Sequence, residues 1–93
     1  MRIALASRLQ RQLKHLPSPL AEDFVEATEQ LMQSFGKSHL HLGLGIRKIH
    51  RRGIFEFRVG RKHRVVFTHP ESDLLMLHIL GDHDEVQYFL KSF

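Results

Sequence analysis

Two arginines near the middle of the chain are spaced so that together they could hold an anion. Residues 53–69, GIFEFRVGRKHRVVFTH, alternate apolar and polar side chains on both sides of a Gly-Arg-Lys interruption, which is the pattern of a β-hairpin. The register that places Phe57 opposite Val65 on the apolar face also places Arg58 opposite Arg64 on the other face. Like charges in such a pair destabilise a sheet, so we expect an anion between them. The forked guanidinium groups fit the oxygens of a phosphate.

More basic residues flank this hairpin. Arg61 and Lys62 fall in its turn, and a basic run, Arg47-Lys48 to Arg51-Arg52, precedes its first strand. Such a run can follow the backbone of a nucleic acid, because each Lys or Arg neutralises a phosphate. We expect these residues to bind the backbone or to supply supporting charge. The alternative is that the run is a solvated loop.

The composition fits one small globular domain with a basic surface. The hydrophobic share of 42% and the charged share of 26% are ordinary for a folded protein. The 14 Lys and Arg outnumber the 10 Asp and Glu, which favours a polyanionic partner, nucleic acid first. The chain has no cysteine and no apolar run long enough for a signal peptide or a membrane helix. We therefore expect a cytoplasmic protein.

The eight histidines do not suggest a metal site. His39 and His41 would share one side of an extended segment, and His78 precedes His83 by a loop. No set of them has the spacing of zinc ligands, and thiolate ligands are absent. We expect neither a metal nor a cofactor.

The N-terminal segment is predicted to hold a short strand and a helix. Residues 2–6 alternate like a strand, and Ser7 with Gln10 gives the S-x-x-Q pattern of a capping box for the helix that follows. The alternative is one helix over residues 3–15, because leucines there recur at every fourth position.

A second helix is the clearest element in the sequence. Ser18 is its expected N-cap, Pro19 its first helical residue and Gly36 its end. Its apolar side chains recur every three or four residues, at Leu20, Phe24, Ala27, Leu31 and Phe35. We expect the two helices to form a helical hairpin across one face of a sheet.

The rest of the chain is predicted to be mostly strands. Residues 37–45 are irregular, and residues 46–49 start a strand that precedes the hairpin. Residues 70–73 form a turn. The run 74–80 is nearly all apolar, so it is a strand covered on both faces and lies inside the sheet.

A short helix closes the chain. Asp82 and Glu85 fit the N-cap and the N3 carboxylate of a helix over residues 83–91. Helices followed by strands indicate an α+β fold. We expect one domain over residues 1–93 with two layers: the helical hairpin packed on a twisted antiparallel sheet of about four strands, and the short C-terminal helix.

This order of elements and two segments resemble the RelE/ParE superfamily of bacterial toxin-antitoxin toxins. The segments are GIRKIHRRGIFEFRVGRKHRVVF and DLLMLHILGDHDEVQYFL, and the resemblance covers residues 9–90. Its best marker is a run that contains Glu56, Arg58, Gly60, Arg64 and Phe67.

The resemblance implies two functions of different classes. Members of the RelE branch are endoribonucleases that cut messenger RNA, mostly on the ribosome, and a cognate antitoxin protein neutralises them. Members of the ParE branch inhibit DNA gyrase and perform no chemistry. A third possibility is a descendant that has lost toxicity and only binds a partner.

The RelE branch also implies roles for particular residues. Arg58 and Arg64 match arginines on two consecutive strands, His83 falls at a C-terminal histidine found in several ribonuclease members, and Tyr88 lies near a Tyr or Phe of others. RNA can be cut without metal when its 2′-hydroxyl attacks the neighbouring phosphorus. Arg58 and Arg64 would then clamp the phosphate, and His83 would act as general acid or base.

Structural roles compete with these assignments. Arg58 and Arg64 could be solvated or paired with Glu56, and His83 could merely start a helix. The Tyr88 ring is suited to a core. The titratable His83 beside two arginines favours the ribonuclease over the gyrase inhibitor, because a pure binding protein needs no proton donor or acceptor there.

Overall fold

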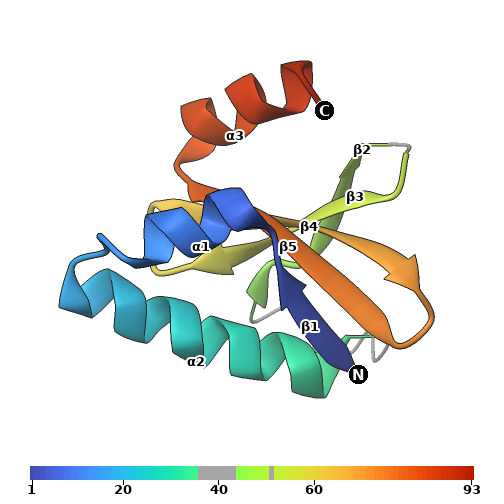
Figure 1. The fold of residues 1–93 in the computed structure, drawn as a ribbon, viewed down its shortest axis with the longest axis horizontal. Coiled ribbons are helices and arrows are strands. Elements are labelled where there is room, and N and C mark those ends of the chain that lie inside the picture. Colours follow the sequence, from blue (N-terminus) through green and yellow to red (C-terminus); the bar gives the residue numbers. More distant parts are fainter. Residues whose placement is uncertain (36–43, 51) are drawn as a thin grey trace.

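The computed structural model describes residues 1–35, 44–50 and 52–93, and Figure 1 shows its fold. Most of the predicted irregular segment, residues 37–45, lies outside these residues. Gly36, the predicted end of the second helix, also lies outside them. In chain order the elements are β1 (Arg2–Leu5), α1 (Ser7–Leu13), α2 (Ser18–Ser34), β2 (Arg47–His50), β3 (Ile54–Val59), β4 (His63–Glu71), β5 (Leu74–Gly81) and α3 (His83–Lys91).

The strands form one mixed sheet in the order β1-β5-β4-β3-β2. Strand β1 pairs with β5 in parallel, and the other neighbours pair antiparallel. The prediction of an antiparallel sheet of about four strands is therefore wrong in both respects. The alternation of side chains predicted each strand but carries no information on the direction of pairing between β1 and β5, which are far apart in the sequence. The predicted interior position of β5 is confirmed, since it lies between β1 and β4.

Beyond the end of the short strand β1, a side chain of α1 takes over its role as hydrogen-bonding partner of β5. The register of β1 reaches Leu77 of β5, and beyond it Gln12 of α1 pairs with the backbone of Leu80. The Gln12 Nε2 donates to the Leu80 carbonyl oxygen at 2.7 Å, and the Leu80 N–H donates to the Gln12 Oε1 at 3.0 Å. These two hydrogen bonds satisfy strand groups that would otherwise lack a ladder partner and fix α1 over the sheet.

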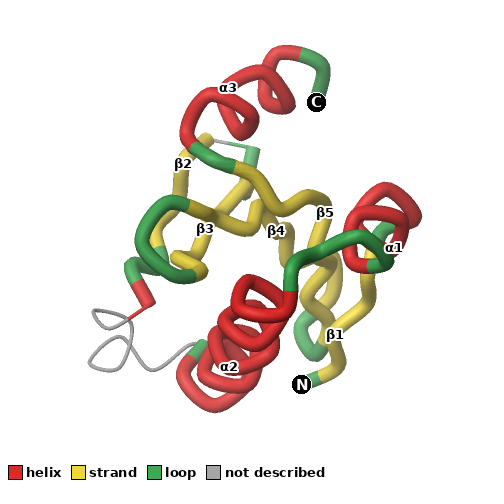
Figure 2. The backbone as a smooth tube through the Cα atoms, turned by 90° about the vertical axis from the view of Figure 1, so that its left-hand side faces the viewer, coloured by secondary structure: helices red, strands yellow, loops and turns green. Residues whose placement is uncertain are grey.

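Helices α1 and α2 cover one face of the sheet. Their buried side chains, Leu9, Phe24 and Leu31, pack with sheet residues that include Phe57 and Phe67. Helix α1 lies mainly against β5 and α2 against β3, as Figures 1 and 2 show. The apolar stripe predicted for α2 is confirmed. The predicted helical hairpin is not, because each helix packs chiefly on its own strand.

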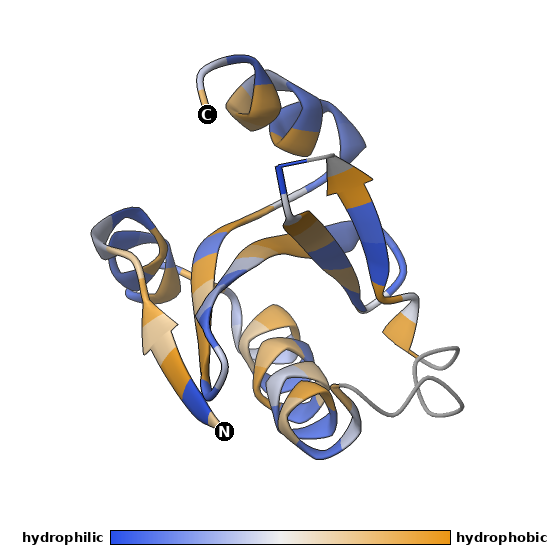
Figure 3. Cartoon of the chain, turned by 90° about the vertical axis from the view of Figure 1, so that its right-hand side faces the viewer, coloured by the Kyte–Doolittle hydropathy of each residue, from blue (hydrophilic) through white to orange (hydrophobic). Residues whose placement is uncertain are grey.

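Helix α3 packs on the opposite face, so the fold has three layers and not the two predicted. Its Val86 is buried with Ile54, Val66 and Ile79, and Figure 3 shows the hydrophobic side of this helix turned toward the sheet. A Cβ atom on Gly81 would lie 2.8 Å from the Cβ of a residue in the first turn of α3. Only glycine therefore allows β5 to turn this tightly into α3.

The helix starts are predicted with mixed success. The capping box of α3 is confirmed: Asp82 and Glu85 each accept a hydrogen bond of 2.9 Å from the backbone N–H of the other. The capping box predicted for α1 does not form, because the N-cap is Ala6, whose side chain has no acceptor, and not Ser7. The Gln10 side chain donates to the Leu5 carbonyl oxygen at 2.7 Å. The N-cap of α2 is Pro17 and not Ser18.

The structure corrects two further predictions, one at the N-terminus and one between β4 and β5. The alternative of one helix over residues 3–15 is wrong, since β1 precedes α1. Strand β4 runs through Glu71, so the turn predicted over residues 70–73 is shorter and starts at Ser72. Among the residues described, none of the helices has the length and apolar character needed to cross a bilayer.

Candidate functional site

The cross-strand register of the central hairpin is confirmed. Phe57 pairs with Val65, and Arg58 pairs with Arg64. Paired residues of an antiparallel sheet point to the same face, and the face of Phe57 is buried under α2. Both arginines therefore lie on the other face, beside α3. Arg58 is exposed, and the Arg64 side chain keeps 30% of its surface accessible.

The carboxylate of Glu56 forms ion pairs with two arginines of this face. It is only 3% exposed, and its Oε2 lies 3.1 Å from the Nε of Arg64 and 3.1 Å from the Nε of Arg47. A buried carboxylate is stable only with such partners, so Glu56 holds both arginines in place. The expectation that the Arg58–Arg64 pair needs an outside anion is thus too strong, because an internal anion already balances Arg64.

The site nevertheless keeps an excess of positive charge. On strands β2, β3 and β4, Arg47, Arg58 and Arg64 share this face with the carboxylate of Glu56. The contact with Glu56 uses one nitrogen of the Arg64 guanidinium, which has five N–H donors in total. The remaining donors of Arg64 are able to bind a phosphate while Glu56 fixes the group's orientation.

Arg58 takes a different direction from Arg64. Its guanidinium lies over Gly45, where an added Cβ atom would be 3.0 Å from Nη2 and 3.2 Å from Nε. Gly45 has a φ of 63°, a conformation that favours glycine. The missing side chain at residue 45 therefore makes room for Arg58. The two arginines share a face without touching the same protein group.

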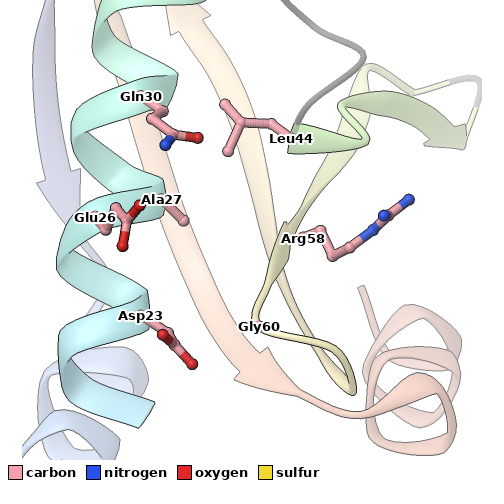
Figure 4. Close-up of a pocket in the computed structure, with 7 residues that line it drawn as sticks. All are labelled: Asp23, Glu26, Ala27, Gln30, Leu44, Arg58 and Gly60. Atoms are coloured by element: carbon pink, nitrogen blue, oxygen red, sulfur yellow. The ribbon is translucent and has the colours of Figure 1, made fainter. Parts of the chain in front are cut away.

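The acidic residues of α2 do not neutralise Arg58. A cavity of about 310 Å³ lies between α2 and the start of the β3–β4 turn, and Asp23 and Glu26 are among its lining residues. Figure 4 shows the Arg58 side chain pointing away from these carboxylates. Arg58 also lines this cavity, so the carboxylates of α2 stand across the cavity from the base of the Arg58 side chain.

His83 lies at the Arg64 end of the sheet. Arg64 pairs with Gly81, the last residue of β5, and His83 follows two residues later as the first residue of α3. Its side chain is exposed. Tyr88 is 70% exposed and lies more than one helical turn further along α3. Helix α3 thus begins near the strand position of Arg64, and Tyr88 lies on the outer surface.

The predicted RNA-binding residues are dispersed. Arg61 and Lys62 are exposed in the β3–β4 turn, next to the arginine pair. Lys48 pairs with Phe55, whose ring packs on the α2 side, so its register position is on the face away from Arg58. Arg52 is exposed between β2 and β3, and Arg51 lies outside the described residues. The RNA-binding roles of all five stay predictions.

Sequence reasoning placed Arg47 in a basic run but missed its ion pair with Glu56, and it missed the burial of Glu56. The strand that contains Arg47 was predicted, but its register with β3 passes through the irregularity between Lys48 and His50. A pattern of alternating side chains cannot specify such a shift. The glutamate was visible as the middle residue of Phe-Glu-Phe, and that polar position in a strand of large apolar residues was the available signal.

A second histidine on the α3 face has a structural role. The Nε2 of His78 lies 2.8 Å from the Thr68 Oγ1, and its ring packs against Phe89 and Phe93. Burial lowers the pKa of His78, which favours the neutral ring in this apolar setting. Within residues 1–35, 44–50 and 52–93, no three His, Cys, Asp or Glu side chains gather into a group that could hold a metal ion.

Comparisons with known proteins find similarity in structure. No family profile matches the chain, and no characterised protein sequence matches it significantly. A chain of a RelB–RelE antitoxin-toxin complex from Methanococcus jannaschii superposes with a TM-score of 0.67 at 20% identity, over 92% of this chain and 96% of the other. The similarity therefore extends over most of both chains.

Two bacterial structures are similar over the same extent. A chain of a YoeB–YefM complex from Staphylococcus aureus gives a TM-score of 0.62 at 17% identity, over 89% of this chain and 97% of the other. YafQ from Escherichia coli BL21(DE3) gives 0.58 at 14% identity, over 91% and 96%. At these identities the likeness establishes the fold.

The role of Gly45 can be tested against a matched glycine. Gly45→Ala is expected to displace the Arg58 guanidinium, because the new Cβ would meet Nη2 at 3.0 Å. Gly53→Ala is the control: Gly53 also has a positive φ, of 78°, but a Cβ there meets nothing within 4 Å. Both variants should lose about 1 kcal/mol of stability through backbone strain, measured by urea unfolding. Only Gly45→Ala should shift the Arg58 Nε–H resonance in NMR spectra; equal shifts in both variants would contradict the contact.

Proposed function

Because this chain has the fold of the RelE-like toxins, we propose that it is the toxin of a toxin-antitoxin pair and an endoribonuclease that cleaves messenger RNA on the ribosome. Its partners are a cognate antitoxin protein, messenger RNA and the ribosome, and it acts in the cytoplasm. The observation that supports the catalytic part is the pairing of Arg58 with Arg64 on an accessible face, with Arg64 fixed by the buried Glu56.

The arginines stabilise the charge that develops during cleavage. When the 2′-oxygen of RNA attacks the adjacent phosphorus, negative charge builds up on the two non-bridging phosphoryl oxygens. Guanidinium donors that are already oriented stabilise that charge without reorganising during the reaction. Glu56 supplies this orientation for Arg64, and the glycine at residue 45 leaves Arg58 the room to reach the surface.

His83 carries the proton transfer. In this step the bond between phosphorus and the 5′-oxygen breaks, and the leaving oxygen takes a proton, while the 2′-hydroxyl loses one. Histidine titrates near neutral pH and can do either task. Its exposed position beside the Arg64 end of the sheet lets it reach a bound backbone. Glu56 is unsuited to be the base, because it is buried and already forms ion pairs with two arginines. The reaction as proposed needs no metal.

Expression of the chain in bacteria separates this function from gyrase inhibition. A ribonuclease should stop translation quickly and leave cut transcripts, and coexpression of the antitoxin should restore growth. An SOS response with intact transcripts would instead identify a gyrase inhibitor.

Arg64→Ala should abolish growth arrest. We expect the RNA cleavage rate to fall by about 10²- to 10³-fold, the usual effect of removing one donor to a developing oxyanion. Arg64→Lys keeps the positive charge but lacks the paired N–H donors of the guanidinium, so it should restore only a small part of the cleavage rate. The measurement is cleavage of a labelled transcript in a translation reaction.

Arg47→Ala is the matched control for Arg64→Ala. It also removes one partner of the buried Glu56, but its side chain is 63% exposed and is not opposite Arg58. The two variants should unfold at similar denaturant concentrations, while Arg47→Ala loses less than about tenfold in rate. A folded Arg64→Ala protein that still arrests growth would remove Arg64 from the mechanism.

His83→Gln should slow cleavage and leave RNA binding intact. Glutamine keeps hydrogen-bonding capacity but cannot exchange a proton, so we expect a loss of about 10²- to 10⁴-fold in rate. The plot of cleavage rate against pH should lose its acidic or its basic limb. Loss of a residue with a purely structural role would leave the shape of this plot unchanged. Single-turnover cleavage and fluorescence anisotropy with the same RNA give the two quantities. An unchanged cleavage rate would show that another group transfers the proton.

A further inference from the structure

The outer side of α2 differs in charge from the rest of this basic protein. Residues 18–34 contain four of the ten acidic residues and neither Lys nor Arg. Glu22, Glu26 and Glu29 are all exposed and recur at intervals of three and four residues, so they line one side of the helix. The chain as a whole carries a net charge of +4. A local acidic surface on such a protein selects basic partners.

Exposed apolar side chains lie beside these glutamates. Val25 is 54% exposed and Met32 is 47% exposed, which makes them two of the few large hydrophobic residues on the described surface. With Ala21 they follow the helical repeat at intervals of four and seven residues, outside the buried stripe of α2. A shallow hollow of about 360 Å³ is lined by Ala21, Val25 and the three glutamates.

We propose that this α2 ridge, defined as Ala21, Glu22, Val25, Glu26, Glu29 and Met32, binds a basic amphipathic helix of a partner protein. The partner's apolar side chains pack on Ala21, Val25 and Met32, as helices do in grooves. Its Lys or Arg side chains, placed beside that apolar stripe, pair with the glutamates at the rim and set its orientation.

Charge argues against a second copy of this chain as the occupant. In a symmetric dimer the same patch would face itself, which would bring the glutamates of both copies together. Like charges at an interface oppose association, whereas a basic helix meets opposite charge along the whole ridge. The complementary partner is therefore a different protein.

The ridge is independent of the proposed ribonuclease site. Helix α2 packs on the sheet face that carries Phe57, and the opposed pair Arg58 and Arg64 lies on the other face. Figure 1 shows α2 and α3 on opposite sides of the sheet. Of the ridge residues, Glu26 also lines the cavity that Arg58 lines, and Ala21, Glu22, Val25 and Glu29 do not. A partner seated on the apolar side of the ridge therefore leaves Arg64 accessible, and its binding does not depend on catalysis.

A synthetic peptide tests the ridge directly. The probe is a fluorescent helix of leucines and lysines with leucine at heptad positions a and d, and the control peptide has the same composition in scrambled order. Fluorescence anisotropy should show micromolar binding of the ordered peptide only. Amide shifts in NMR spectra should map to α2, with the resonances of Arg64 and α3 unchanged.

Substitutions on the ridge should remove this binding. Val25→Ser combined with Met32→Ser changes exposed residues only and should weaken it at least tenfold, as should Glu22→Lys combined with Glu29→Lys. The control Asp84→Lys adds positive charge on α3 and should weaken it less than threefold. Circular dichroism verifies that each variant is folded. No binding, shifts outside α2, or unchanged affinity in the ridge variants would overturn the proposal. So would self-association of the protein alone that is lost in Val25→Ser/Met32→Ser, because it would identify a second copy as the occupant.

Discussion

The buried carboxylate of Glu56 is the interaction on which the arginine face depends. An ionised group with 3% exposure is tolerated only when charged partners replace its water, and here they come from the strands on both sides of β3. Arg47 on β2 and Arg64 on β4 are therefore fixed relative to each other by one oxygen atom. The cost of leaving that oxygen unpaired keeps Arg64 in one orientation, and this prior orientation is what electrostatic catalysis requires.

The two faces of the sheet have different roles: one carries most of the core and the other carries the arginines. Helices α1 and α2 bury the face of Phe57 and Phe67, which supplies most of the core. Helix α3 covers only part of the other face through Val86. The polar residues of β3 and β4 thus stay accessible beside α3. The tight turn at Gly81 makes α3 start close to the strand position of Arg64, which is how His83 comes to the same end of the sheet.

The sequence predicted the structural features that depend on residues close together in the chain. It did not predict those that depend on contacts between distant segments. Alternation on two adjacent strands was enough to place Arg58 opposite Arg64, and the capping pattern located the start of α3. The parallel pairing of β1 could not be predicted, because its partner lies at the far end of the chain. The predicted N-caps of α1 and α2 were wrong by one residue: the N-caps are Ala6 and Pro17, so Ser7 and Ser18 are already helical. The position of Glu56 between two phenylalanines was a local signal of its burial, but its pairing with Arg47 depends on the register of β2, which local alternation does not specify.

The central claim is that Arg58 and Arg64 hold the same phosphodiester, and NMR of the arginine Nε–H groups tests it most directly. The protein is titrated with a short RNA whose 2′-hydroxyl at the cleavage position is replaced by hydrogen, so that it binds without being cut. The account predicts that the Arg58 and Arg64 resonances shift together with one dissociation constant, while Arg2, held by Asp73 and Glu71 at the start of β1, does not move. Different constants for the two arginines, or a shift of only one, would contradict it.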